Sequence, residues 1–141
     1  MIKELNIDSI YLNDLENNFT DVFTKKNVKN DIMNNEFTNY LTYIVDNQAV
    51  AFINYYTMYE RAELININVL EKFQNQNIAT KLINRMIEDC QSKNVKSITL
   101  EVKITNDKAI HLYQKFGFHE IGIRKGYYQG IDGILMEKEL M

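Results

Sequence analysis

The feature of the sequence that most constrains the fold is a change of hydrophobic period within residues 64–86. Polar and apolar side chains first alternate, with Ile65, Ile67 and Val69 on one face, as in a β-strand. After a polar elbow, apolar residues recur at helical spacing from Ile78 onward. The sequence therefore predicts a strand that turns tightly into an amphipathic helix.

The polar elbow, residues 71–77, brings a chemical expectation. The first N–H groups of a helix have no partner inside the helix, and the helix dipole places partial positive charge beside them. Phosphate groups bind at such positions. An ordinary strand-to-helix connection has the same pattern, so the elbow alone leaves both interpretations open.

The composition narrows the class of protein. The chain has 141 residues, enough for one hydrophobic core, and we expect a single domain over residues 1–141. Apolar residues make up 45% and charged residues 25%, as in soluble globular proteins. The net charge of −3 argues against direct binding of nucleic acid. No segment has the pattern of an export signal or a membrane span, so we expect a cytoplasmic protein.

Cysteine and histidine are too scarce for a metal site of the usual spacing. Cys90 is the single cysteine, and His111 and His119 are the two histidines. We therefore expect no bound metal and no internal disulfide. Cys90 continues the apolar face of the predicted helix and is interpreted as a core residue.

The N-terminal third is predicted to hold one strand and two helices. The strand covers residues 2–7, and Asp8 or Ser9 is expected to cap the helix that follows. That helix is expected to end before Lys25, and a short helix is expected over residues 28–37.

The rest of the chain is predicted to alternate between strands and helices. Strands over residues 40–46 and 48–59 are expected to meet at a hairpin turn of Asp46 and Asn47. The later segments are a strand at 97–102, a helix at 105–117, a strand at 118–124, a glycine-punctuated loop at 125–132 and a strand at 133–140. This order predicts an α/β fold with a twisted mixed sheet of about six to seven strands and helices on both faces.

A long motif in the second half resembles a known family. From Leu100 to Phe118 the sequence follows the pattern L-E-V-x-x-x-N-x-x-A-I-x-L-Y-x-x-x-G-F. This pattern resembles the C-terminal signature of the GNAT superfamily of N-acetyltransferases. Together with Arg124, Tyr127 and Tyr128 it is most similar to the branch that acetylates ribosomal-protein N-terminal alanine (RimI type). The resemblance implies acetyl-CoA as co-substrate, a ribosomal-protein N-terminus as partner, and a monomer or weak homodimer.

The resemblance also implies roles for individual residues. Glu101 takes the position of the general base, which removes a proton from the substrate amine. Tyr113 takes the position of the general acid, which protonates the departing thiolate. Taken singly, a strand glutamate is usually solvent-facing and a helix tyrosine is usually core. Arg124, Tyr127 and Tyr128 are implied to clasp the substrate backbone, although adjacent tyrosines also serve as a lid over a core.

Acetyl-CoA is implied to bind along the predicted strand, the elbow and the start of the next helix. The residues implied to bind it are Ile67, Asn68, Val69, Gln74, Asn75, Gln76, Asn77, Ile78, Ala79, Thr80 and Asn106. The loop of the family has the form Q/R-x-x-G-x-G/A, and here Asn75 and Asn77 stand where glycines are usual. Asparagine adopts left-handed backbone angles more readily than most residues, so we predict that the loop keeps its shape.

Three functions remain open from the sequence. The first is acetylation of a protein N-terminus, and the second is acetylation of a small-molecule amine. The third is a non-catalytic acyl-CoA-binding module, which the two asparagines in the loop bring into consideration. The clasp residues favour the first function over the second. The presence of Glu101 and Tyr113 favours an enzyme over the third.

Overall fold

The computed structural model of the chain describes residues 1–23 and 27–140. Within them one seven-stranded sheet has the order β1-β2-β3-β4-β5-β7-β6. The strands are β1 (Ile2–Glu4), β2 (Thr38–Val45), β3 (Gln48–Met58), β4 (Arg61–Val69), β5 (Ser97–Lys103), β6 (His119–Tyr128) and β7 (Ile131–Glu139). Neighbouring strands are antiparallel except β4 and β5, which are parallel. The predicted mixed sheet is confirmed.

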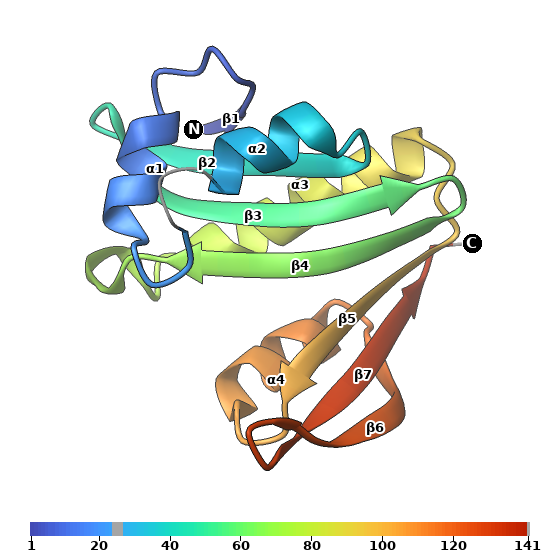
Figure 1. Cartoon of the computed structure of the whole chain (residues 1–141). Coiled ribbons are helices and arrows are strands. Elements are labelled where there is room, and N and C mark those ends of the chain that lie inside the picture. Colours follow the sequence, from blue (N-terminus) through green and yellow to red (C-terminus); the bar gives the residue numbers. More distant parts are fainter. Residues whose placement is uncertain (24–26, 141) are drawn as a thin grey trace.

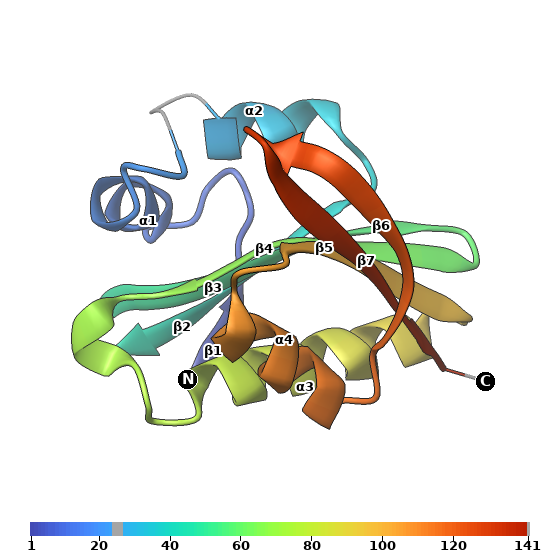
Figure 2. The same ribbon diagram turned by 90° about the horizontal axis from the view of Figure 1, so that it is seen from below.

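Helices cover both faces of the sheet (Figures 1 and 2). One face carries α1 (Leu12–Asn18) and α2 (Asn27–Asn34), and the other carries α3 (Ile78–Ser92) and α4 (Asp107–Lys115). A short 3₁₀ turn, η1 (Glu71–Phe73), lies in the elbow before α3. No described helix is long and apolar enough to cross a membrane.

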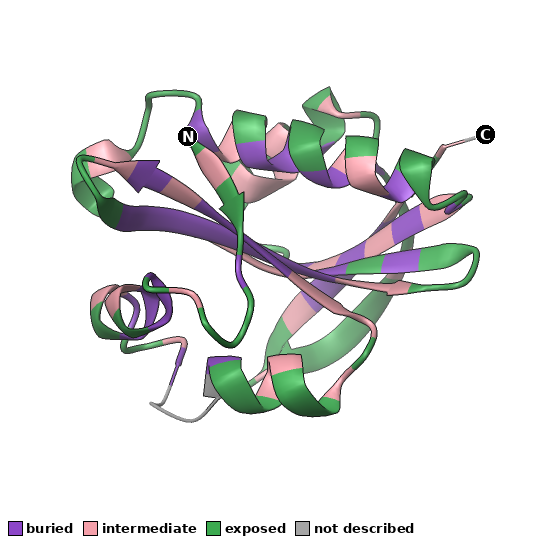
Figure 3. Ribbon diagram, turned by 90° about the horizontal axis from the view of Figure 1, so that it is seen from above, coloured by how far each residue is buried: buried purple, intermediate pink, exposed green. Residues whose placement is uncertain are grey.

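The two layers of helices give the sheet two apolar cores. Figure 3 shows β3 buried along most of its length, because helices pack on both of its faces. Leu15 and Val28 belong to the core beneath α1 and α2. Leu82, Met86 and Cys90 belong to the larger core beneath α3, so Cys90 is a core residue as predicted. Burial of these apolar faces is the main force that fixes the helices on the sheet.

The hairpin between β2 and β3 has the predicted turn residues. Asp46 and Asn47 have φ angles of 49° and 63°. Two successive left-handed residues are typical of the type I′ turn, which suits the twist of paired strands.

The N-terminal segment differs from the prediction. The first strand ends at Glu4, and α1 begins at Leu12 rather than directly after Asp8 or Ser9. The Ser9 Oγ accepts a hydrogen bond from the Tyr11 N–H at 3.2 Å, so it stabilises a turn before the helix. The helix ends at Asn18, and Lys25, the predicted limit, lies outside the described residues.

Strand β4 contains a bulge that the sequence pattern did not indicate. Its pairing with β3 shifts register so that Asn54 faces Asn66 while Tyr55 faces Leu64. Ile65 is the extra residue, and such a residue reverses the faces of the strand beyond it. Leu64 and Ile67 therefore both contact the core beneath α3. The prediction that Ile65 shares a face with Ile67 was wrong for this reason.

The predicted loop at residues 125–132 is also mostly strand. Strand β6 continues to Tyr128 and β7 begins at Ile131, so the hairpin turn is Gln129 and Gly130. These two residues have positive φ angles of 52° and 92°. Tyr128 is half-buried, whereas Tyr127 is exposed.

The feature that positions the site is the divergence of β4 from β5. Pairing between them joins Arg61–Glu63 to Ser97–Thr99, and beyond this point the two strands separate (Figure 1). The strands that separate lose their shared hydrogen bonds, so main-chain donors and acceptors on both inner edges are left facing an open space.

Candidate active site

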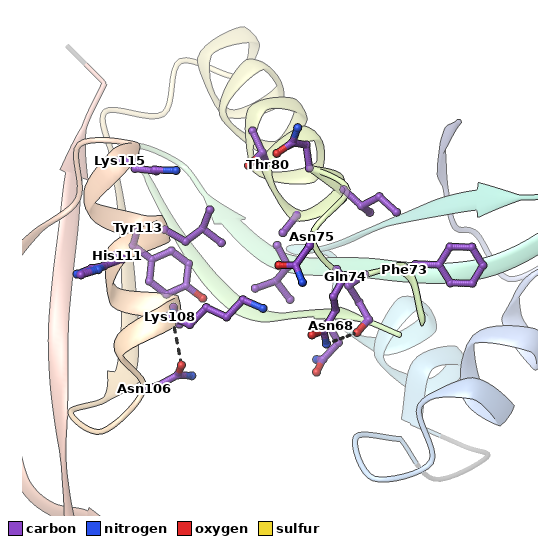
Figure 4. A pocket seen from close by; sticks show the side chains of 17 residues that line it. Asn68, Phe73, Gln74, Asn75, Thr80, Asn106, Lys108, His111, Tyr113 and Lys115 are labelled. Atoms are coloured by element: carbon purple, nitrogen blue, oxygen red, sulfur yellow. Dashed lines mark hydrogen bonds between the residues drawn. The ribbon is translucent and has the colours of Figure 1, made fainter. Parts of the chain in front are cut away.

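A cleft of about 700 Å³ lies at the end of β4, and we call it the elbow cleft (Figure 4). Its walls are the end of β4 with the elbow, the start of α3, and α4. The predicted acetyl-CoA residues that line it are Ile67, Asn68, Val69, Gln74, Asn75, Asn77, Ile78, Ala79, Thr80 and Asn106. Gln76 is in the elbow but does not line the cleft.

The elbow has the backbone shape predicted from its asparagines. Asn75 and Asn77 have φ angles of 62° and 63°, in the left-handed region. Asn77 is the N-cap residue of α3, and its side chain makes no capping hydrogen bond. The first N–H groups of α3 therefore lack the side-chain acceptor that usually covers a helix start. These donors are available to an anion in the elbow cleft.

Gln74 links the elbow to the strand. Its Nε2 donates a hydrogen bond of 3.1 Å to the carbonyl oxygen of Val69. This bond holds the elbow against the end of β4, where Ile67, Asn68 and Val69 line the cleft.

A second hollow of about 420 Å³ lies between the diverging strands, and we call it the strand pocket. Glu101 and Tyr128 line it, together with residues of β4. The strand pocket and the elbow cleft share four lining residues, which are Ile67, Asn68, Asn106 and Tyr113. The two hollows therefore meet beside Tyr113.

Glu101 presents its carboxylate to the strand pocket from β5. It alternates with the buried residues Leu100 and Val102, so it lies on the opposite face of the strand. Its Oε1 is buried and has no hydrogen-bond partner among the described residues. The Arg124 Nε lies 3.5 Å away, within ion-pair distance but without a hydrogen bond. Glu101 is therefore a buried acceptor that faces one cation.

Gly133 makes room for this carboxylate. A Cβ at this position would lie 3.0 Å from the Glu101 Oε1 and 3.0 Å from the Tyr128 ring. These distances are tighter than almost all contacts of real Cβ atoms. A larger side chain at position 133 would push Glu101 or Tyr128 from its place.

Tyr113 lies on α4, where the two hollows meet. The residue is buried, and its ring packs against Phe118 with centroids 6.0 Å apart. Burial raises the pKa of Tyr113 to about 12, with a smaller contribution from Tyr128. The hydroxyl therefore stays protonated through the neutral range and can serve as a proton donor.

The three predicted clasp residues lie around the strand pocket. Tyr128 lines it, and its pKa is raised by burial and then by Glu101. Tyr127 packs edge-on against Tyr128 with centroids 5.0 Å apart. The Arg124 guanidinium lies 4.8 Å from the Tyr127 ring centre, a cation–π contact. Arg124 and Tyr127 are exposed and do not line the pocket itself.

Asn106 sits at the start of α4 and belongs to both hollows. Its Oδ1 accepts a hydrogen bond of 3.2 Å from the Ala109 N–H, which caps the helix. The cap fixes the orientation of the side chain and leaves its Nδ2 as a hydrogen-bond donor.

Comparison with known proteins decides the family. The model of the acetyltransferase (GNAT) family matches residues 6–118. The chain belongs to the GNAT acetyltransferase family.

Named relatives and solved structures agree with this assignment. The [ribosomal protein bS18]-alanine N-acetyltransferase of Haemophilus ducreyi is 36% identical over 107 residues, which is 74% of this chain and 74% of the relative. The ribosomal-protein-S18-alanine N-acetyltransferase from Escherichia coli has a similar structure, with a TM-score of 0.85 and 24% identity over 99% of this chain and 94% of that chain. A GNAT acetyltransferase from Elizabethkingia anophelis with acetyl-CoA bound has a TM-score of 0.80 and 23% identity over 99% of this chain and 97% of that chain.

The structure of this GNAT chain also reveals site residues that sequence reasoning missed. Those of the elbow cleft are Phe73, Lys108, Ala109, His111, Leu112 and Lys115. Lys108, Leu112 and Lys115 recur at a spacing of three or four residues on α4, so helical periodicity could have placed them on one face. Lys103, which lines the strand pocket, and Gly133, which lies beside Glu101, have no such local signal, because strand pairing brings them to Glu101 and Tyr128.

Among the described residues, no group of three or more histidine, cysteine, aspartate or glutamate side chains could hold a metal ion. His111 lines the elbow cleft, but its ring points away from the other labelled side chains (Figure 4).

Proposed function

We propose that this enzyme transfers the acetyl group of acetyl-CoA to the N-terminal α-amine of another protein. We propose further that the acceptor is ribosomal protein bS18 and that the modified residue is its N-terminal alanine. The observation that carries the proposal is the junction of the elbow cleft and the strand pocket at Asn68, Asn106 and Tyr113. A transfer reaction needs a donor site and an acceptor site that open onto one point. The names of the bS18-alanine N-acetyltransferase relatives support the choice of acceptor.

Acetyl-CoA fits the residues of the elbow cleft. Its pyrophosphate would meet the uncapped N–H groups at Ile78, Ala79 and Thr80. Its pantetheine amides would pair with those main-chain groups of residues 67–69 that face the open edge of β4, in place of a neighbouring strand. The thioester then lies at the junction of the two hollows.

The acceptor must lose a proton before it reacts. An N-terminal ammonium has a pKa of about 7.7–8.0, so at neutral pH most of it is protonated. The buried Oε1 of Glu101 has no hydrogen-bond partner in the described part of the chain and faces the strand pocket, so it takes this proton, directly or through one water. The freed nitrogen attacks the carbonyl carbon of the thioester.

The departing thiolate of CoA receives its proton from Tyr113. As the C–N bond forms and the C–S bond breaks, the Tyr113 hydroxyl donates a proton to the sulfur. Its raised pKa, caused by burial, keeps the proton available until this step. The nitrogen loses a second proton as the amide forms; this proton restores Tyr113 through solvent, and Glu101 releases its own proton to solvent. The products are the acetylated amine and CoA as a thiol.

The residues beyond the amine would contact the hairpin of β6 and β7. Tyr128 borders the strand pocket, and the exposed Tyr127 and Arg124 extend the same surface outward. We propose that these three side chains hold the backbone of the acceptor protein. A small amine would not need these contacts.

We propose that the enzyme acts in the cytoplasm, where it would meet its ribosomal-protein substrate, and that residues 1–141 act as one domain.

The test uses the full chain with acetyl-CoA and a peptide that carries the bS18 N-terminal sequence. Mass spectrometry should find one added acetyl group at the α-amine of the N-terminal alanine. A peptide with the same sequence and a blocked N-terminus is the control, and it should remain unmodified. Transfer to small polyamines or aminoglycosides, with none to the peptide, would instead identify a small-molecule acetyltransferase.

Calorimetry tests the third hypothesis, that the protein is a non-catalytic acyl-CoA-binding module. Binding of acetyl-CoA without transfer to any amine would identify an acyl-CoA-binding module. No heat and no thermal shift at millimolar acetyl-CoA would contradict both enzyme hypotheses.

A further inference from the structure

The wall of the elbow cleft formed by α4 carries two lysines. Lys108 and Lys115 are seven residues apart, so they lie on the same face of the helix, separated by about 10 Å along its axis. Both line the cleft, and Figure 4 shows their side chains directed across it, toward the elbow and the start of α3.

The charge of the cleft is opposite to the charge of the protein. The chain has a net charge of −3, yet the lining contains two lysines and no aspartate or glutamate. Neither lysine forms an ion pair with a described residue. The positive end of the α3 dipole adds to their field from the facing wall. Such a cleft favours a ligand with several negative charges.

The position of each lysine relative to the reacting end differs. The junction with the strand pocket, at Asn106 and Tyr113, marks the reacting end. Lys108 lies in the first turn of α4, two residues after Asn106. Lys115 lies in the last turn. Neither lysine lines the strand pocket, but Figure 4 shows the Tyr113 hydroxyl directed toward the end of α4 that carries Asn106 and Lys108, with Lys115 at the opposite end. A long ligand with its acyl group at the junction would therefore pass Lys108 before it reaches Lys115.

We propose that Lys108 and Lys115 bind the phosphates of the acyl donor, and that Lys115 selects donors that carry the 3′-phosphate of CoA. This inference rests on the proposed function. Lys108 contacts the pyrophosphate from the wall opposite the elbow. Lys115 contacts the 3′-phosphate, the most negative group of the donor, because a phosphomonoester carries about −1.5 to −2 charges at neutral pH.

The expected effect is moderate because both lysines are exposed. A charge-assisted hydrogen bond between an ammonium and a phosphate is stronger than a neutral one, but water screens it at the surface. We expect a loss of one lysine to weaken binding of the donor by about fivefold to tenfold. The loss should become smaller as salt is added.

The experiment combines three variants with two ligands. Lys115→Gln, Lys108→Gln and the control Lys29→Gln each remove one positive charge, and Lys29 lies on α2, on the other face of the sheet. Calorimetry measures the affinity of each protein for acetyl-CoA and for 3′-dephospho-acetyl-CoA. Lys115→Gln should weaken binding of acetyl-CoA and leave binding of the dephospho ligand unchanged. Lys108→Gln should weaken the binding of both ligands equally, and Lys29→Gln should leave the binding of both unchanged.

Two results would overturn the inference. An equal loss for both ligands in Lys115→Gln would contradict recognition of the 3′-phosphate, and no loss in either cleft variant would contradict both contacts. A failure of the unmodified protein to bind acetyl-CoA would contradict the proposed function instead. Thermal unfolding of each variant without ligand separates a loss of binding from a loss of folded protein.

Discussion

The elbow cleft and the strand pocket are built in different ways. The elbow cleft comes mainly from one continuous stretch, β4, the elbow and α3, closed by α4. Its important features are main-chain features: two left-handed asparagines and uncapped N–H groups. The strand pocket joins side chains from strands that are distant in the sequence, such as Glu101 of β5 and Tyr128 of β6.

The elbow cleft and the strand pocket should therefore differ in how well they tolerate side-chain substitutions. Main-chain donors remain after most side-chain substitutions, so the elbow cleft can accept asparagine where the family usually has glycine. In the proposed mechanism the proton transfers depend on the side-chain chemistry of Glu101 and Tyr113, so these two groups should not be exchangeable in this way. We therefore expect substitutions at the junction and in the strand pocket to affect turnover, and substitutions in the elbow to affect affinity modestly.

The largest effect is expected for Tyr113→Phe, which changes the residue shared by both hollows. Turnover should fall by about 10²–10⁴, the usual range for a positioned acid or base, while affinity for acetyl-CoA stays within a few-fold. Steady-state transfer to the alanine peptide and calorimetry measure the two quantities. Because burial raises the pKa of Tyr113 to about 12, the unmodified enzyme should show no loss of rate from this group between pH 6 and about 9. Near-normal turnover would remove Tyr113 from the mechanism.

A smaller effect is expected for Glu101→Gln, which changes the strand pocket alone. Without the base, the amine must lose its proton to water, and only about a tenth of it is neutral at pH 7. The rate should fall by about tenfold at pH 7 and recover as the pH rises past the pKa of the amine. The pH profile of transfer checks this shift. Glu63→Gln, at an exposed position of β4, is the matched control and should keep the normal profile. An unchanged profile in Glu101→Gln would exclude it as the base.

The smallest effect is expected for Asn77→Gly, which changes the elbow alone. Glycine adopts a φ of 63° without strain, so donor affinity should stay the same or rise by a few-fold. Asn94→Gly is the control, because Asn94 has a φ of 61° beyond the other end of α3. Both variants should gain up to about 1 kcal/mol of stability from relief of strain. A tenfold loss of affinity in Asn77→Gly alone would mean that the asparagine side chain itself contacts the donor.

The sequence predicted the elbow cleft better than the strand pocket for a physical reason. The elbow depends on neighbouring residues, and the tolerance of Asn77 for left-handed angles is a local property. The place of Gly133 beside Glu101 depends on the order in which β5 and β7 pair, which no local pattern contains. The pairing of β6 with β7 likewise brings Arg124 near Glu101. The family motif supplied Glu101 and Tyr113, but neither their separation nor their surroundings.

The bulge in β4 explains why the predicted face of Ile65 was wrong. Ile65, Ile67 and Val69 alternate with polar residues without interruption, so the sequence reads as a regular strand. The register shift at Ile65 arises from pairing with β3. Alternation predicts the type of element, and the neighbouring strand decides which face each side chain takes.

The short ladder between β4 and β5 has a thermodynamic consequence. Among the described residues, three pairs join the two halves of the sheet along this seam, Arg61–Glu63 with Ser97–Thr99. A donor that touches Ile67 on one half and Asn106 on the other bridges the seam. A ligand that binds only the folded chain raises the free energy of unfolding in proportion to the logarithm of its concentration above Kd. A donor bound between the two halves of the sheet would therefore also stabilise the fold, and the protein should resist unfolding most when it is saturated with donor.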